Sequence, residues 1–358
     1  MLRAVHIFRK PLAGPKAPRH ADFMFDDEAE PPDIRAPVDL SPRTTRSALI
    51  LRREAFDKGL NADDIKRRLA RGDWTLLRPG AYLQAADSPS PPFERRHLVQ
   101  INAELPYASE NAVVSHLSAA CEHGIDLLRE PGKCVQVTNP VGVSGHRRRL
   151  LHTHRAAIDD DEWILVRGHR VTSVARTVVD VARTRSFEEG VVAADSALHQ
   201  GLVTREELMS AVNRAPRRAG MRLARRVVRF ADAGTESVGE SRSRVLMTYE
   251  RIPVPQVQFK ITVGDGVSVA VSDFGWEEFR TVGEFDGAEK YGRLLLPGER
   301  AGDKVFQEKQ REDLIRDTGL QVVRWTWEDL DQPKHLADRI RRALDRGLRS
   351  AGRAAPPT

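Results

Sequence analysis

Residues 271–292 read VSDFGWEEFRTVGEFDGAEKYG and combine the pattern of paired strands with three acidic residues, Asp273, Glu284 and Asp286. Apolar residues surround each acid, as expected for strands that are partly buried. Side chains alternate between the two faces of a strand, so Glu284 and Asp286 share a face. The stretch therefore predicts a hairpin that carries acids on one of its faces.

The strand pairing predicts where the third acid lies. We expect one strand to end near Trp276, a turn at residues 277–278, and a second strand over residues 279–286. Antiparallel pairing across a two-residue turn places Asp273 opposite Val282, diagonal to the acids of the second strand and on their face. The predicted cluster is therefore Asp273, Glu284 and Asp286.

Three clustered carboxylates repel one another unless a cation lies among them. Oxygen ligands suit hard cations such as Mg²⁺ or Mn²⁺, which could activate a water molecule for hydrolysis of a phosphodiester. The alternative is an exposed strand face with solvated acids or with acids in ion pairs. Both interpretations stay open at this point.

Bulk composition describes a globular protein with a basic balance. The 358 residues suffice for two or three domains, and Lys and Arg exceed Asp and Glu by six charges, which favours polyanions such as DNA as partners. Cys121 and Cys134 form no disulfide framework or thiolate metal motif. No apolar run has the length of a membrane span and the first residues lack a secretory signal, so we expect a cytoplasmic protein that does not enter a membrane.

The N-terminal third predicts a small DNA-binding unit. Residues 1–45 are rich in proline and mixed charge and are expected to be a disordered tail. A helix over residues 47–60, a second helix that Asn61 caps, and two short strands within residues 75–83 follow. Helix, helix and hairpin predict a winged helix-turn-helix domain over residues 46–90.

Basic side chains cover the second predicted helix. Ile65 and Leu69 lie four residues apart and should face the core, which leaves the basic residues on the outer surface. These could contact DNA phosphates, or they could form a solvated helix face. The candidate nucleic-acid-binding residues are Lys66, Arg67, Arg68, Arg71 and Arg78.

The remaining chain divides where its composition changes. Residues 91–234, beginning with a linker at 91–100, alternate strands and helices and predict an α/β scaffold with an Arg176–Asp180 pair on one helix. Residues 235–348 predict a helix, three strands, a helix at 303–319, a strand and a last helix. Residues 349–358 are expected to be a disordered tail.

The C-terminal order resembles the PD-(D/E)XK nuclease fold, most closely its very-short-patch-repair-like branch. The matching residues are Glu240, Asp273 in VSDFG, Glu284-Phe-Asp286-Gly287 and Arg324-Trp325, and the resemblance covers residues 236–347. It implies catalysis by Glu240, Asp273, Glu284, Asp286 and Lys290, with the metal held by Asp273, Glu284 and Asp286. Asp286 occupies the slot where the general pattern has lysine, and Lys290 supplies the basic group four residues later.

Residues 47–84 and the region after them resemble the AbiEi group, the antitoxins of type IV toxin–antitoxin systems. SHLSAACEHG and VTSVARTVVDVA stand where that group has its helical motifs. The resemblance implies a winged helix, DNA as a partner and a cognate toxin. Glu240 carries a second interpretation, because Ser237-x-x-Glu240 also matches a capping box.

These observations predict an α+β multidomain protein with an N-terminal winged helix, an α/β middle domain and a C-terminal restriction-endonuclease-like domain with a mixed sheet. The leading functional prediction is a DNA-associated protein with a Mg²⁺-dependent (or Mn²⁺-dependent) endonuclease domain. The alternative is an AbiEi-like antitoxin and transcriptional repressor whose nuclease fold is inactive. A nucleotide-binding or partner-binding protein that never contacts DNA is the third.

Overall fold

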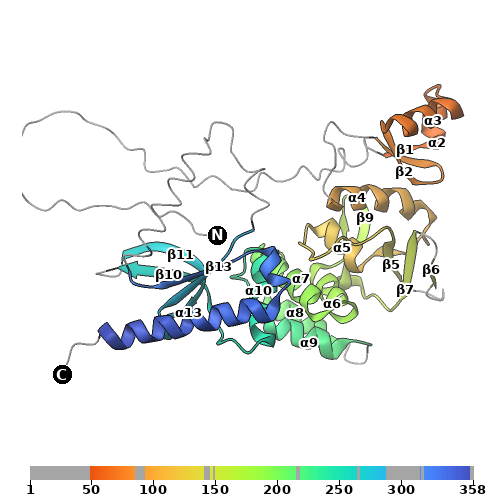
Figure 1. Cartoon of the computed structure of the whole chain (residues 1–358). Coiled ribbons are helices and arrows are strands. Elements are labelled where there is room, and N and C mark those ends of the chain that lie inside the picture. Colours follow the sequence, from red (N-terminus) through yellow and green to blue (C-terminus); the bar gives the residue numbers. More distant parts are fainter. Residues whose placement is uncertain are drawn as a thin grey trace, which may run out of the picture.

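The computed structural model describes residues 49–84, 93–140, 146–147, 150–214, 218–263, 267–287, 315 and 318–354. The predicted tail at residues 1–45, Lys290, and most of the predicted helix at 303–319 lie outside these ranges. Within them the chain is a mixed α+β protein, as predicted, and its strands form three separate sheets. Figure 1 shows the three sheets along the molecule in the order of the sequence.

The first unit contains two helices and a three-stranded sheet of order β1-β3-β2. A small core of Ala55, Ile65, Trp74 and Tyr82 holds it together, with Leu69 packed against that core, so the predicted inward side of the second helix is confirmed. The elements are β1 (Leu49–Leu51), α2 (Arg52–Asp57), α3 (Ala62–Arg71), β2 (Trp74–Arg78) and β3 (Ala81–Gln84).

The middle part has a six-stranded sheet of order β6-β7-β5-β4-β9-β8, with parallel and antiparallel pairs. Its strands are β4 (Val113–Val114), β5 (Val135–Asn139), β6 (His146–Arg147), β7 (Leu151–Arg155), β8 (Trp163–Val166) and β9 (His169–Thr172). Its helices are α4 (Phe93–Glu104), α5 (His116–His123), α6 (Val174–Thr184), α7 (Phe187–His199), α8 (Arg205–Arg214) and α9 (Met221–Phe230). The described ranges also contain the short 3-10 turns η1 (Leu105–Tyr107), η2 (Asp160–Glu162) and, in the last part, η3 (Glu277–Phe279).

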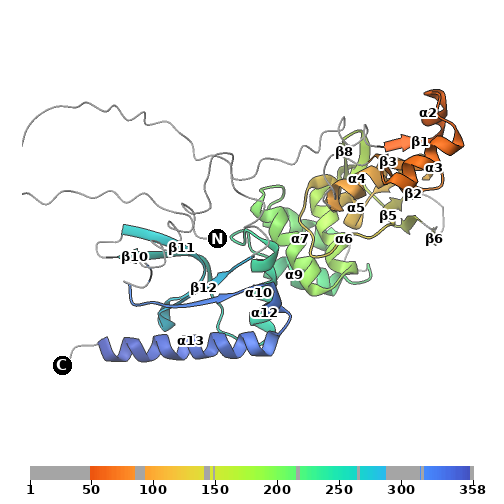
Figure 2. The same cartoon turned by 45° about the horizontal axis from the view of Figure 1, so that its top comes forward.

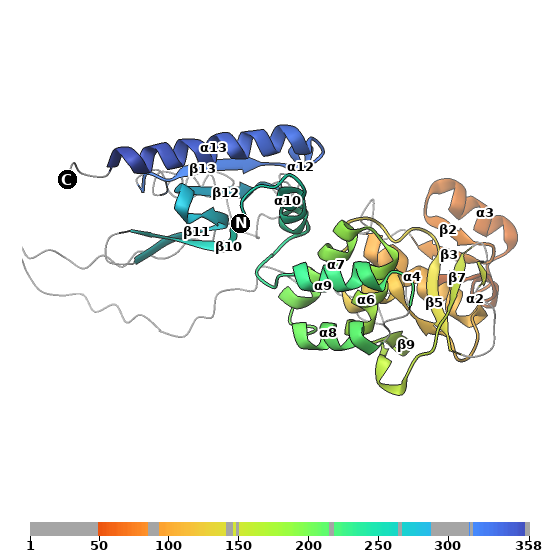
Figure 3. The ribbon, with the colours of Figure 1, turned by 90° about the horizontal axis from the view of Figure 1, so that it is seen from below.

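The last part is a four-stranded sheet of order β10-β11-β12-β13, antiparallel except for the parallel pair β12 and β13. α13 runs along this sheet (Figure 3) and packs Leu336, Ile340 and Leu344 against its apolar face. The elements are α10 (Val238–Tyr249), β10 (Gln256–Val263), β11 (Val267–Trp276), β12 (Thr281–Phe285), β13 (Gln321–Trp325), α12 (Trp327–Leu330) and α13 (Pro333–Ala354).

Several sequence predictions need correction. The predicted helix at 47–60 begins with strand β1, because Leu49–Leu51 pairs with β3 more than thirty residues later in the chain. The predicted linker at 91–100 lies mostly in helix α4, and the predicted C-terminal tail is wrong for residues 349–354, which continue α13. The register of the acidic hairpin also differs, since Val282 pairs with Gly275 instead of Asp273.

Helix α10 belongs to two cores. Val245 is buried with the helices and strands of the middle part, whereas Leu246 and Met247 are buried with α13 and the C-terminal sheet. Neighbouring residues on a helix point in different directions, so one helix can contribute to both sides. The predicted boundary at residue 234 therefore precedes a helix that the two parts share.

Candidate functional sites

Helix α3 carries most of the predicted basic residues, and neighbouring side chains of the same unit already contact several of them. The Asn61 side chain accepts hydrogen bonds from the N–H groups of Asp63 and Asp64, which confirms the predicted N-cap. The cap places both aspartates in the first turn, where the helix dipole favours them. The Asn61 backbone N–H in turn donates to Asp64, which lowers the pKa of that carboxyl.

These aspartates pair with the basic residues one turn later. Lys66 lies 3.5 Å from Asp63, and Arg67 pairs with Asp64. The Arg68 guanidinium lies over the Trp74 ring, 5.1 Å from its centroid. Arg71 is exposed in the last turn, and the side chain of Arg78 lies outside the described part of the chain. A phosphate that approaches α3 must therefore compete with Asp63 and Asp64 for Lys66 and Arg67, both of which remain well exposed.

The middle part contains a buried ionic network. Asp180, fully buried, receives hydrogen bonds from Arg176 at 2.8 Å and from Arg183 at 2.7 Å, so the predicted Arg176–Asp180 pair is confirmed. Arg176 also contacts the buried Glu162 at 2.6 Å. Burial would raise the pKa of Asp180, but its neighbours His116, Arg176 and Arg183 hold it below its usual value. This network joins α6 to the turn before β8.

Stacked histidines adjoin this network. The rings of His116 and His154 stack with centroids 3.8 Å apart, and Arg183 contacts His116 at 3.2 Å. Burial lowers the pKa of His116 to about 4 and that of His154 to about 3. Both imidazoles are therefore neutral near pH 7. Their sequence positions gave no sign of this contact, because His116 begins α5 and His154 lies on β7.

The C-terminal sheet brings Glu240, Asp273 and Glu284 into one buried region. β11 and β12 pair Phe274 with Gly283, so the next position along the ladder sets Asp273 beside Glu284. All three acids are buried. Burial raises the pKa of Glu240, and the Asp273 carboxylate raises it further, which shows that these two groups interact across the helix–sheet junction.

Each acid also has a protein partner. The Asp273 carboxylate accepts a 2.7 Å hydrogen bond from the N–H of Phe285. The parallel register of β12 and β13 places Arg324 beside Glu284. Arg324 donates a 2.7 Å hydrogen bond to the Glu284 carboxylate. Arg324 belongs to the quoted motif, but local spacing does not predict that it pairs with Glu284.

Glu240 lies in the first turn of α10 and bonds with the Ser237 N-cap. It donates its backbone N–H to Ser237 Oγ at 3.2 Å, and its carboxylate accepts from the Ser237 hydroxyl at 2.7 Å. The N–H of Glu236 donates to the other carboxylate oxygen, and Gln258 lies 3.4 Å from that oxygen. Ser237 is therefore the N-cap of α10, as half of a capping box requires, but the Glu240 carboxylate accepts from the backbone of Glu236 in place of the backbone of Ser237. The Glu240 side chain still faces the acidic region.

Helix α10 reaches this position because residue 239 is glycine. A Cβ atom at Gly239 would lie 1.9 Å from the Phe285 ring, so no other residue fits without a shift. Phe285 follows Glu284 directly on β12. The close contact therefore fixes α10 and its Glu240 relative to the strand that carries Glu284.

The predicted metal ligands are Asp273, Glu284 and Asp286. No group of three His, Cys, Asp or Glu side chains in the described ranges has an arrangement that could hold a metal ion. Asp286 is half-buried and its N–H donates to the carbonyl of Trp325 at 2.7 Å. The catalytic and metal-binding roles of the acids, and the role of Lys290 outside the described ranges, stay predictions.

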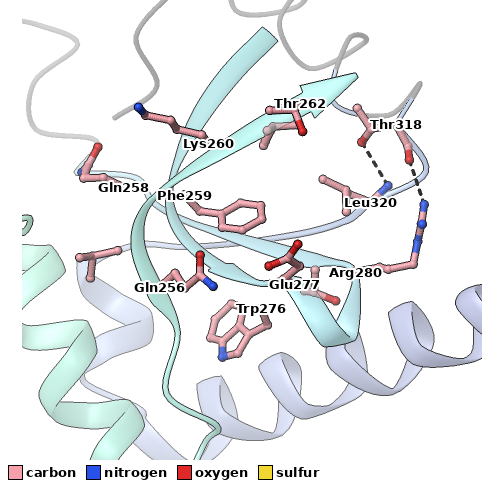
Figure 4. Close-up of a pocket in the computed structure, with 13 residues that line it drawn as sticks. Gln256, Gln258, Phe259, Lys260, Thr262, Trp276, Glu277, Arg280, Thr318 and Leu320 are labelled. Carbon is pink, nitrogen blue, oxygen red and sulfur yellow. Dashed lines mark hydrogen bonds between the residues drawn. The ribbon is translucent and has the colours of Figure 1, made fainter. Parts of the chain in front are cut away.

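A cavity of about 560 Å³ lies on the concave side of β10 and β11 (Figure 4). Phe259, Glu277 and Lys260 line it, and Arg280 closes one side by donating to the carbonyl of Thr318 at 3.0 Å. Gln258 belongs both to this lining and to the surroundings of Glu240. The lining does not include Asp273 or Glu284.

Comparison with known proteins defines the class of the middle part. Residues 112–226, from β4 into α9, match the AbiEi antitoxin C-terminal domain. Two proteins of Mycobacterium tuberculosis, uncharacterized protein MT2308 of strain CDC 1551 / Oshkosh and uncharacterized protein Rv2248 of strain H37Rv, are each 30% identical to this chain over 250 residues. Each match spans 68% of this chain and 84% of the relative.

The chain belongs to the family of these two mycobacterial proteins and contains an AbiEi antitoxin C-terminal domain. The crystal structure of the RV2827C protein from Mycobacterium tuberculosis matches with 14% sequence identity and a TM-score of 0.33, over 52% of this chain and 73% of that one. In the described ranges no helix has the length and apolar character needed to cross a membrane.

Proposed function

We propose that this protein is a DNA-binding regulator of the antitoxin type, in which the N-terminal unit contacts DNA and the AbiEi domain serves a toxin–antitoxin system. The match of residues 112–226 to an antitoxin domain carries this proposal. It favours the repressor interpretation over the nuclease interpretation of the sequence. The same domain implies a cognate toxin as a partner.

The N-terminal unit supports the DNA-binding half of the proposal. Two helices followed by a β-hairpin agree with a winged helix, and this unit precedes the matched antitoxin domain, which begins at residue 112. Lys66, Arg67 and Arg71 are exposed on α3, which would enter or flank the major groove in such a unit. Phosphate contacts by these residues would supply affinity that depends strongly on salt.

The test replaces the predicted contact residues together. The variant Lys66→Ala, Arg67→Ala, Arg71→Ala, Arg78→Ala should bind the DNA upstream of its own gene at least about tenfold more weakly, with a shallower dependence on salt. Fluorescence anisotropy at several salt concentrations measures both quantities. A matched variant that removes the same charge from α13, by alanine at Lys334, Arg342, Arg346 and Arg349, should retain binding. An unchanged salt slope in the α3 variant would place DNA contact elsewhere.

A metal-dependent nuclease remains the second candidate. The convergence of Glu240, Asp273 and Glu284 favours it, because three buried acids in one region are costly without a compensating cation. Against it, Arg324 already compensates Glu284, and no group of three possible ligands in the described ranges is arranged around a metal ion. Plasmid nicking by the full chain in Mg²⁺ or Mn²⁺ measures this activity directly.

A further inference from the structure

Helix α9 has an apolar face inside the middle part and a basic face outside it. Its sequence, MRLARRVVRF, contains no acidic residue. The buried residues are Met221, Ala224, Val227 and Val228. The opposite face has the i, i+3, i+4, i+7 spacing of one helix side. We call its residues the arginine row: Arg222, Arg225, Arg226 and Arg229. In Figure 1 the helix lies along the lower margin of the middle part.

The arginine row is exposed and lacks acidic partners. Three of its side chains are exposed and Arg225 is half-buried. None of the four pairs with an acid in the part of the chain that the structure describes. On the neighbouring helix α10, by contrast, Arg244 pairs with the buried Asp195 at 2.9 Å. Like charges four residues apart destabilise a helix, so this row gains stability from an anion outside the chain.

An aromatic ring lies open to solvent beside the arginine row. The Arg226 guanidinium lies over the Phe187 ring of α7, 4.2 Å from its centroid, and over the Tyr249 ring of α10 at 5.8 Å. It also donates to the Tyr249 hydroxyl at 3.5 Å. Phe187 is buried, whereas Tyr249 is 57% exposed. Figure 2 labels the helices that meet here, α7, α9 and α10.

We propose that the arginine row and Tyr249 bind a single strand of nucleic acid, with the arginines on its phosphates and the ring beside a base. From Arg222 to Arg229 the helix extends about 10 Å. About three successive phosphates of one strand match this length, at roughly 3.4 Å of rise each. Guanidinium groups bind phosphate oxygens through two parallel hydrogen bonds.

The exposed ring favours a single strand over other anionic partners. Aromatic side chains stack on unpaired bases of any sequence, whereas a duplex keeps its bases stacked on one another. An acidic protein segment would neutralise the arginines but would leave the Tyr249 ring without a stacking partner. A nucleotide supplies a phosphate and an aromatic face together. This inference does not depend on the contact of α3 with duplex DNA.

Fluorescence anisotropy with a labelled oligothymidylate of about 20 nucleotides tests the proposal, because this strand forms no duplex and is longer than one site. The variant Arg222→Gln, Arg225→Gln, Arg229→Gln should bind it at least about tenfold more weakly than wild type. Each lost phosphate contact lowers the slope of log affinity against log salt by about 0.7, so the slope should be shallower by about two. Arg226 is retained because it packs on two rings.

A matched variant removes the same charge from another helix. Arg342→Gln, Arg346→Gln, Arg349→Gln on α13 should bind the strand with the affinity and salt slope of wild type. Both triple variants should melt close to wild type, because glutamine supports a helix nearly as well as arginine. Absence of strand binding by wild type, or an α9 variant with the affinity and salt slope of wild type, would overturn the proposal.

Tyr249→Leu tests the base contact separately. It keeps an apolar side chain beside Phe187 but removes the ring, so strand binding should weaken at least about fivefold. The salt slope should stay that of wild type because no phosphate contact is lost. Unchanged affinity would overturn the placement of a base on this ring. Displacement of the strand by poly-glutamate as effectively as by unlabelled oligothymidylate of equal charge would indicate an acidic protein partner instead.

Two crossed measurements separate this inference from the proposed contact of α3 with duplex DNA. The α3 variant described above should bind the single strand like wild type. The α9 variant should bind the duplex upstream of the gene like wild type. Loss of strand binding in the α3 variant alone would place the strand on α3 and overturn the assignment to α9.

Discussion

At the scale of single residues, the C-terminal acids are held by protein groups. Glu284 is buried, and Arg324, whose side chain is 35% exposed, donates to it from the neighbouring strand. A buried carboxylate needs such a partner, and removal of one member of a pair leaves the other without compensation. The stability of Glu284 variants therefore reports whether this region works as an ion-pair network.

We expect Glu284→Gln to lower the free energy of unfolding by about 1–2 kcal/mol, because Arg324 loses a charged partner while Gln retains one acceptor. Urea denaturation in EDTA measures this effect. Glu278→Gln changes an exposed acid of the same hairpin and should have almost no effect. The ion-pair interpretation and the metal interpretation predict opposite changes in the stability of Glu284→Gln.

The opposite result would support the metal interpretation. A metal-free protein with three clustered acids is relieved of repulsion when one is neutralised, so Glu284→Gln would then be as stable as wild type or more so. Wild type would also melt at a higher temperature in Mg²⁺ or Mn²⁺, and the variant would lose any plasmid nicking. Loss of stability without a metal-induced shift would exclude that interpretation.

The sequence predicted which acids share a face but not what they contact. Alternation along the strand is a local property, so Glu284 and its strand could be placed from the hairpin alone. Arg324 follows 40 residues later, and its contact with Glu284 depends on the parallel pairing of β12 with β13. Long-range pairing of this kind has no signature in local spacing.

At the scale of elements, the contact of α10 with β12 decides where Glu240 lies. The predicted strands and the predicted first and last helices of this part were found, but the register of the acidic hairpin was wrong by two residues. The connection between β11 and β12 runs through η3 and Arg280, whose φ is 44°, in place of a two-residue turn. Arg280 takes a left-handed conformation that non-glycine residues seldom adopt, so sequence alone favoured the shorter turn.

Gly239→Ala tests the close contact between α10 and β12. We expect it to lower the free energy of unfolding by about 1–3 kcal/mol, because the new Cβ overlaps the Phe285 ring, although alanine favours a helix. Thermal denaturation measures the change. Gly287→Ala is a matched control, since its Cβ would make only an ordinary 3.4 Å contact with the same ring.

A double variant can show whether Gly239→Ala loses stability through the clash with the Phe285 ring or through a general effect on the backbone. Combining it with Phe285→Leu removes the ring that clashes, so the double variant should lose less stability than the sum of the two changes. Additive losses would show that Gly239 is not needed for this contact. The burial of Glu240 would then have another origin.

Strand β1 and helix α4 show a second limit of local patterns. The residues Leu49–Leu51 fit a helix or a strand equally well, and pairing with β3 selects the strand. Residues 91–100 begin with two prolines and suggest a linker, yet Leu98, Val99 and Ile101 are buried in the middle part. In both cases tertiary contacts override a weak local signal.

At the scale of the whole molecule, ion pairs join the AbiEi domain to the C-terminal sheet through α10. Arg244 contacts Asp195 of α7 at 2.9 Å, and Arg242 bridges Glu188 of α7 and Asp331 near α12. Asp195 is fully buried, and burial raises its pKa to about 6 although Arg244 favours its charged form. Helix α10 is therefore held against the AbiEi domain by the buried Arg244–Asp195 pair as well as by apolar contacts.

Arg244→Met should destabilise the protein by about 3 kcal/mol at pH 7.5, because Asp195 remains buried without its partner. The folded pKa of Asp195 already exceeds its unfolded value of 3.8 and should rise further in the variant. Protonation then removes the penalty, so the loss relative to wild type should shrink as the pH falls from 7.5 to 5. Calorimetry at both pH values measures this trend.

The double variant Asp195→Asn, Arg244→Met provides the control for this pair. It removes both charges and should recover much of the lost stability at pH 7.5, with little dependence on pH. A destabilisation by Arg244→Met that is equal at both pH values would indicate lost packing against Phe230, over whose ring Arg244 lies at 4.7 Å. Asp195 would then not be the cause.

The shared helix α10 also limits how such proteins can recombine. Its Val245 completes the core of the antitoxin domain while Leu246 and Met247 complete the core of the C-terminal sheet. A genetic crossover between relatives at residue 234, where the composition changes, would give the antitoxin domain a helix α10 that was selected in another parent. A crossover after Tyr249 would do the same to the core of the C-terminal sheet, so productive exchange of the last part should replace α7, α9 and α10 together with it.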